Sequence, residues 1–187
     1  MNDGLSRVLR GGHKLARSAG SSIRKAILRA EYPGLIFKGS VYIGPGCDIR
    51  VNRGGKLVLE NCHVSRGVTL TVGASALLDI SADFIGPNSV LVARESLVVG
   101  EGTKIAENVV VRDGNHDHSV PLRSLKFTSS PVRIGSDVWL GAGCAVLSGV
   151  SIGSSATVGA GAVVTRAIPA GSVATGVPAV AKPRSPA

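Results

Sequence analysis

From Ile134 to Pro169 the chain repeats a six-residue pattern without interruption. Each of the six hexads begins with an aliphatic residue, and in four of them that residue is followed by Gly. A period of six fits neither an amphipathic helix nor an alternating strand. It is the period of one short strand plus one corner in a hexapeptide β-helix. The pattern therefore predicts a solenoid whose core is a column of stacked aliphatic side chains.

The composition agrees with this architecture. The chain holds 25 Gly, and aromatic residues make up only 3%. A globular core would use more aromatic side chains, whereas a solenoid needs stacked Val, Ile and Leu with Gly at its tight corners. The three cysteines are scattered without a CxxC pair, which argues against a disulfide framework or zinc knuckle. Free thiols, and the absence of a long apolar run or signal peptide, predict a cytoplasmic protein.

The periodicity divides the chain into three regions. We expect a basic amphipathic helical segment at 1–36, a β-helix at 37–169 and a C-terminal tail at 170–187. Residues 113–133 interrupt the hexads, are polar and hold two of the four histidines. We interpret them as a loop inserted at a corner of the solenoid. Such insertions often carry the binding residues of repeat proteins.

The N-terminal segment carries most of the excess charge. Residues 1–38 hold eight basic and two acidic residues, which is +6 of the net +9. Three interpretations stay open: a helical cap on the open end of the solenoid, a peripheral contact of residues 1–31 with the inner face of a membrane, and a flexible basic arm. Nucleic acid is not an expected partner, because no aromatic interleaving or binding motif accompanies the charge.

Three stretches carry a resemblance to a known family: 138–153, 158–165, and the Ala-Thr-Gly-Val-Pro-Ala run at 174–179. They resemble the hexapeptide-repeat acyltransferases, and within these the sugar and polysaccharide O-acetyltransferases. As a fold, the resemblance covers residues 37–184. It implies a left-handed parallel β-helix, a homotrimer with active sites between subunits, and acetyl-CoA as donor. The implied acceptor is a sugar hydroxyl in surface polysaccharide or glycolipid biosynthesis.

The resemblance also implies that a histidine of the inserted loop is the general base. His116 directly follows Asn115, as in the Asn-His form of the family motif, and His118 is its competitor. Imidazole titrates near neutrality, so its neutral form can remove the proton of an attacking hydroxyl. Asp113 and Asp117 are the candidates to orient the ring.

The donor site follows from the same resemblance. The amide of Ala142, from the neighbouring subunit, would stabilise the oxyanion of the tetrahedral intermediate. The pantetheine arm would lie against Ala142, Gly159 and Ala160. Thr165 and Arg166 match a donor-contacting pair, and the candidates for the phosphates are Arg166, Lys182 and Arg184. Relatives often carry a basic residue two positions after the Pro of Gly-Val-Pro, where this chain has Val180.

Other functions remain as alternatives. An N-acetyltransferase acting on an amino sugar needs the same donor and the same base. A zinc-dependent lyase resembling the γ-class carbonic anhydrases would take its ligands from His13, His63, His116 and His118. A scaffold without catalytic activity is the third alternative. The acetyltransferase interpretation requires no metal.

Overall fold

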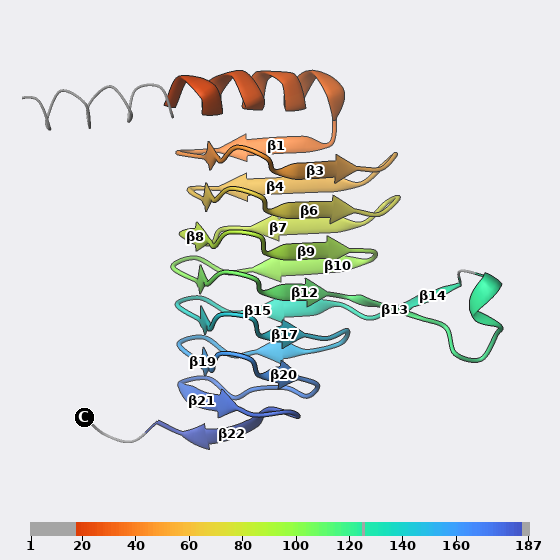
Figure 1. Cartoon of the computed structure of the whole chain (residues 1–187), viewed down its shortest axis with the longest axis vertical. Helices are drawn as coiled ribbons and strands as arrows, with labels where there is room; N and C mark the ends of the chain where they lie inside the picture. The colour runs from red at the N-terminus through yellow and green to blue at the C-terminus, as the bar shows by residue number, and fades with distance from the viewer. Residues whose placement is uncertain (1–17, 125, 185–187) are drawn as a thin grey trace, which may run out of the picture.

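The computed structural model describes residues 18–124 and 126–184. A helix at residues 18–31 lies across one end of a three-sided, left-handed parallel β-helix, and a hairpin projects from the side of the stack (Figure 1). The predicted fold class is thereby confirmed. One helix of the predicted N-terminal segment falls among the described residues.

Each coil contributes one short strand to each of three parallel sheets. The first sheet holds β1 (Leu35–Lys38), β4 (Lys56–Glu60), β7 (Leu77–Ile80), β10 (Ser96–Val99), β15 (Val132–Ile134) and β18 (Ser151–Ile152). The second holds β2 (Tyr42–Ile43), β5 (His63–Val64), β8 (Phe84–Ile85), β11 (Lys104–Ile105), β16 (Trp139–Leu140), β19 (Thr157–Val158), β21 (Ser172–Thr175) and an antiparallel β22 (Val180–Pro183). The third holds β3 (Asp48–Val51), β6 (Thr69–Val72), β9 (Val90–Ala93), β12 (Val110–Arg112), β17 (Ala145–Val146) and β20 (Val163–Val164).

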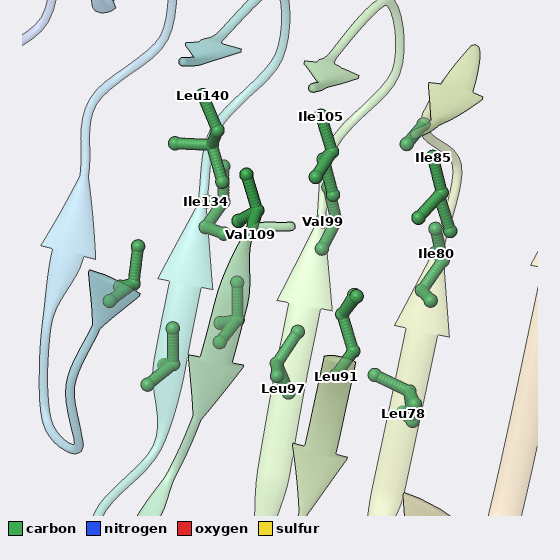
Figure 2. Packing of buried hydrophobic residues seen from close by; sticks show 14 of the residues in the cluster. Leu78, Ile80, Ile85, Leu91, Leu97, Val99, Ile105, Val109, Ile134 and Leu140 are labelled. Carbon is green, nitrogen blue, oxygen red and sulfur yellow. The ribbon is translucent and has the colours of Figure 1, made fainter. Parts of the chain in front are cut away.

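The core is a column of aliphatic side chains stacked in register (Figure 2). Leu78 pairs with Leu97, and Ile105 pairs with both Ile85 and Leu140; all five side chains are fully buried. Burying one such side chain stabilises a fold by roughly 1.5–3 kcal/mol. Because equivalent residues stack on one another, the repeat itself supplies the core.

The coils differ in length along the stack. Tyr42 pairs with His63 and His63 with Phe84, a spacing of 21 residues, whereas Trp139 pairs with Thr157, a spacing of 18. Strands of four or five residues in the first and third sheets account for the longer early coils. This explains why the six-residue period is regular only in the later coils.

The corner between the second and third sheets, here called the amide corner, has the same geometry in six coils. Its central residue is followed by a residue with φ between 57° and 68°, which is Gly or Asn in every case because these tolerate the left-handed region. In the first five of these corners the carbonyl of the central residue accepts a hydrogen bond from the next coil, as from Gly161 N–H to Ala142 O at 2.8 Å. The central residues are Pro45, Arg66, Pro87, Glu107, Ala142 and Ala160.

Candidate functional site

The segment that breaks the repeat forms a hairpin at the corner between the third and first sheets. Its strands are β13 (Gly114–His116) and β14 (Phe127–Ser129), and a 3₁₀ turn, η1 (Leu122–Ser124), lies between them. Antiparallel pairing sets Asn115 opposite Thr128 and His116 opposite Phe127. The candidate base therefore lies on a strand that projects from the solenoid (Figure 1).

Asp113 fastens the base of this hairpin to the coil before it. The side chain is fully buried, and its carboxylate accepts three backbone hydrogen bonds. The donors are Arg94 N at 2.7 Å, Glu95 N at 2.8 Å and Ser96 N at 2.8 Å. Three donors leave this carboxylate little capacity for a further partner. Asp113 thus anchors the hairpin, and its proposed role in orienting the imidazole stays a prediction.

The His116 ring is held by an aromatic neighbour. It lies on Phe127, with ring centroids 4.4 Å apart and an interplanar angle of 36°. The guanidinium of Arg94 lies over the Phe127 ring, 3.3 Å from its centroid. Sequence reasoning missed both Arg94 and Phe127. The one available signal was an aromatic residue within a polar loop of a chain poor in aromatics.

The remaining loop candidates form a local turn. The Asp117 carboxylate accepts hydrogen bonds from Ser119 N at 2.9 Å and Ser119 Oγ at 2.6 Å, and these hydrogen bonds lower the pKa of the Asp117 carboxyl. His118 is exposed, and neither a hydrogen bond nor a ring contact of its side chain occurs among the described residues. Packing therefore orients His116, whereas His118 lacks an equivalent support.

Three of the predicted donor residues lie together at the amide corner. Ala142 and Ala160 occupy its central position in successive coils, and Gly159 precedes Ala160. Within the described part of the chain, the Ala142 N–H has no hydrogen-bond partner, because the inter-coil ladder uses only its carbonyl. A Cβ on Gly159 would lie 2.8 Å from Thr175 Cγ2, so a larger residue there would require the Thr175 side chain to shift. The corner thus offers small side chains and a free amide donor.

The base and this amide lie at different edges of the prism. The hairpin leaves the solenoid between β12 and β15, which is the edge between the third and first sheets. Ala142 lies between β16 and β17, at the edge between the second and third sheets. One protomer therefore does not bring the two groups to one edge.

The predicted basic residues occupy two other places. Thr165 and Arg166 are exposed at the edge that carries the hairpin, two coils further along. Lys182 lies on β22 opposite Val173, and Arg184 Nη2 donates to Thr157 Oγ1 at 2.8 Å and to Ser155 O at 3.2 Å. The returning strand β22 thus brings the basic tail back to the second sheet.

The other reactive side chains lie apart from this site. Burial raises the pKa of the Cys144 thiol to about 12, which disfavours the nucleophilic thiolate. His63 stacks between Tyr42 and Phe84 on the second sheet, and His13 lies outside the described residues. Between residues 18 and 184, leaving out residue 125, no three His, Cys, Asp or Glu side chains are grouped to hold a metal ion.

Comparisons with known proteins agree with this architecture. Residues 131–166 match the family described as bacterial transferase hexapeptide (six repeats). Nodulation protein L of Rhizobium meliloti is 34% identical over 109 residues, which are 58% of this chain and 51% of that protein. A probable acetyltransferase of Mycobacterium tuberculosis, Rv3034c, is 30% identical over 122 residues, 63% of this chain and 41% of that protein. The chain thus spans about half the length of the curated relatives it matches.

A solved structure extends the likeness over most of the fold. AntD, an N-acyltransferase from Bacillus cereus, was solved in complex with dTDP and 3-hydroxybutyryl-CoA. It superimposes with a TM-score of 0.69 over 84% of this chain and 87% of its own, at 17% sequence identity. At that identity the likeness concerns the fold. The resemblance to the hexapeptide-repeat acyltransferases is confirmed by the family match and these relatives.

Proposed function

We propose, from the likeness to the hexapeptide-repeat transferases, that this protein is an acetyltransferase that moves the acetyl group of acetyl-CoA to a sugar hydroxyl. The observation that carries the proposal is a pair of complementary groups at two edges of one prism. One edge presents the supported imidazole of His116, and the other presents the unpaired N–H of Ala142. Acyl transfer needs a general base and an oxyanion donor, which are these two groups.

A cyclic trimer resolves the separation of the two groups. When three prisms lie parallel around a three-fold axis, one edge of each protomer lies against a different edge of its neighbour. Such an interface is heterologous, and the three-fold rotation closes it into a ring. In this arrangement the hairpin of one protomer faces the amide corner of the next. The active site is then shared, and each trimer holds three equivalent sites.

The chemistry is a direct transfer. Neutral His116 accepts the proton of the acceptor hydroxyl as its oxygen attacks the thioester carbonyl carbon. The carbonyl oxygen gains negative charge, and the N–H of the neighbour's Ala142 donates a hydrogen bond to it. When the intermediate collapses, the C–S bond breaks and the protonated imidazole returns its proton to the departing sulfur. An enzyme nucleophile is not required, in agreement with the raised pKa of the Cys144 thiol.

The donor residues fit a long, anionic co-substrate. Small residues at the amide corner allow the pantetheine arm to approach the backbone closely. Guanidinium groups bind phosphates through charge-assisted hydrogen bonds, which suits Arg166 and Arg184, while Lys182 acts as a point charge. Arg184 already contacts the second sheet, so its charge is held beside β19.

The acceptor atom has a second candidate. AntD is an N-acyltransferase, and a mutant of it was solved in complex with dTDP-4-amino-4,6-dideoxyglucose and coenzyme A, so the structural likeness favours an amino sugar as the alternative acceptor. A neutral imidazole can remove a proton from the attacking hydroxyl of a sugar or from the attacking amine of an amino sugar. The selectivity between O- and N-transfer must therefore come from the acceptor pocket around the hairpin.

The proposal predicts release of CoA thiol that depends on both acetyl-CoA and a sugar. The purified full chain would be incubated with acetyl-CoA and a panel of neutral and amino sugars, with thiol release followed by a chromogenic reagent. The product ester is cleaved by mild alkali, whereas an amide is not, which separates O- from N-transfer. Thiol release that no sugar raises above the rate of donor hydrolysis would contradict the proposal.

A further inference from the structure

The helix at residues 18–31 contacts the first coil of the solenoid through polar side chains and through Leu28. Ser21 is buried, and its Oγ accepts a hydrogen bond from Ile43 N at 2.9 Å. Arg24 donates to Ile43 O from Nε at 3.0 Å and Nη2 at 2.8 Å, and Lys25 Nζ donates to Val41 O at 2.8 Å. The first coil has no preceding coil to satisfy its backbone groups, and these side chains take that place. The side chains of Arg24 and Lys25 therefore cap the first coil of the solenoid.

The opposite face of the same helix is apolar and exposed. The side chain of Ile23 is 62% exposed and that of Ile27 58%. Ala19, Ala26 and Ala30 are also exposed, and with the two isoleucines they follow a spacing that places all five on one side of a helix. An amphipathic helix on a globular domain ordinarily buries such a stripe. Here the stripe faces away from the solenoid, and Leu28 on the other side of the helix packs against the core.

The end of the solenoid that carries this helix is cationic. Beside the helix lies a pocket of about 960 Å³ whose lining includes Arg24, Lys25, Arg66 and His63 together with serine hydroxyls, and no carboxylate. Residues 18–38 hold four basic residues and one acidic residue, Glu31, a balance of +3. A second copy would bring the same charge to the same face, and like charges repel. An anionic partner is favoured over another protomer.

We propose that this N-terminal face docks on an anionic lipid surface. Ile23 and Ile27 enter the boundary between headgroups and acyl chains, while the basic residues around them attract acidic headgroups. The contact is peripheral, since no helix among residues 18–184 is long and apolar enough to cross a membrane. The helix thus joins two roles: it closes the solenoid with its polar side chains and Leu28, and it presents the apolar stripe to the lipid.

Vesicle co-sedimentation of the full chain tests this docking. We expect binding to phosphatidylcholine vesicles containing about 30% phosphatidylglycerol, weak binding to pure phosphatidylcholine, and loss of binding as salt rises. The double substitution Ile23→Ser with Ile27→Ser lowers the partition coefficient at least about tenfold, because two exposed side chains no longer enter the lipid. Arg66→Gln weakens binding to the anionic vesicles through charge alone.

The matched control lies at the other end of the stack. Val177 and Val180 are 72% and 59% exposed, so Val177→Ser with Val180→Ser removes a similar exposed apolar surface. This control keeps vesicle binding if the N-terminal face is the docking site. Equal binding of the isoleucine variant and the unmodified chain overturns the proposal, as does equal binding to neutral and anionic vesicles. Loss of vesicle binding in millimolar glycerol phosphate would assign the pocket to a free phosphate rather than a lipid surface. A doubling of the particle mass without vesicles, lost in the isoleucine variant, would assign the stripe to a second copy of the protein. Either result contradicts the proposal.

Discussion

Replacing His116 with Ala lowers kcat for acetyl transfer by about 10²–10⁴-fold, the usual contribution of a general base. The side chain is exposed and its ring lies on Phe127, so the free energy of unfolding changes little. Steady-state kinetics and urea unfolding of the same preparation separate the two effects.

His118→Ala is the control for this variant. His118 lies two residues away on the same hairpin and is also exposed, but it lacks the aromatic support that orients His116. We expect its kcat to stay within a few-fold of the unmodified enzyme. A large loss in the His118 variant together with full turnover in the His116 variant would assign the base to the other histidine.

Ala142→Pro removes the proposed oxyanion donor while keeping the backbone path. Loss of one such donor typically lowers kcat by about 10²–10³-fold. Pro fits this corner, since Pro45 and Pro87 occupy the equivalent position in two earlier coils, each after a Gly as Ala142 is. The substitution therefore tests the N–H itself rather than the integrity of the coil.

Glu107→Pro is the matched control at the amide corner. Glu107 occupies the same position one coil before Ala142, and its carbonyl accepts the N–H of Gly143 at 2.9 Å. This variant also loses one corner N–H, and we expect it to keep kcat within a few-fold. Equal losses in the two Pro variants would show that the corner tolerates Pro poorly, and the oxyanion assignment would fail.

The sequence predicted the solenoid because its later coils are regular. Hexads from Ile134 onward repeat with 18 residues a coil, so their period appears directly in the chain. The earlier coils keep the same three sheets but are longer, with 21 residues between Tyr42 and His63, and their longer strands blur the six-residue pattern. The prediction held there because the aliphatic core positions persist even where the corner spacing changes.

Candidate site residues could be predicted from the sequence only where a short sequence motif includes them. His116 was identified through its position after Asn115, which needs no knowledge of the hairpin. Phe127 and Arg94 were not, because one lies on the opposite strand of a non-periodic insertion and the other a coil earlier. Asp113 was given an orienting role from its nearness in sequence. Its burial beneath three backbone donors appears only in three dimensions.

We propose that each active site takes its base from one protomer and its oxyanion donor from the next. Co-expression of chains carrying His116→Ala with chains carrying Ala142→Pro tests it, because each parent alone is inactive. Random mixing in a closed trimer pairs an intact hairpin with an intact amide at about one site in four, so the mixture should recover about a quarter of the unmodified activity. If the mixed preparation assembles and stays as inactive as its parents, the two groups act within one protomer or not at all, and the shared site is contradicted.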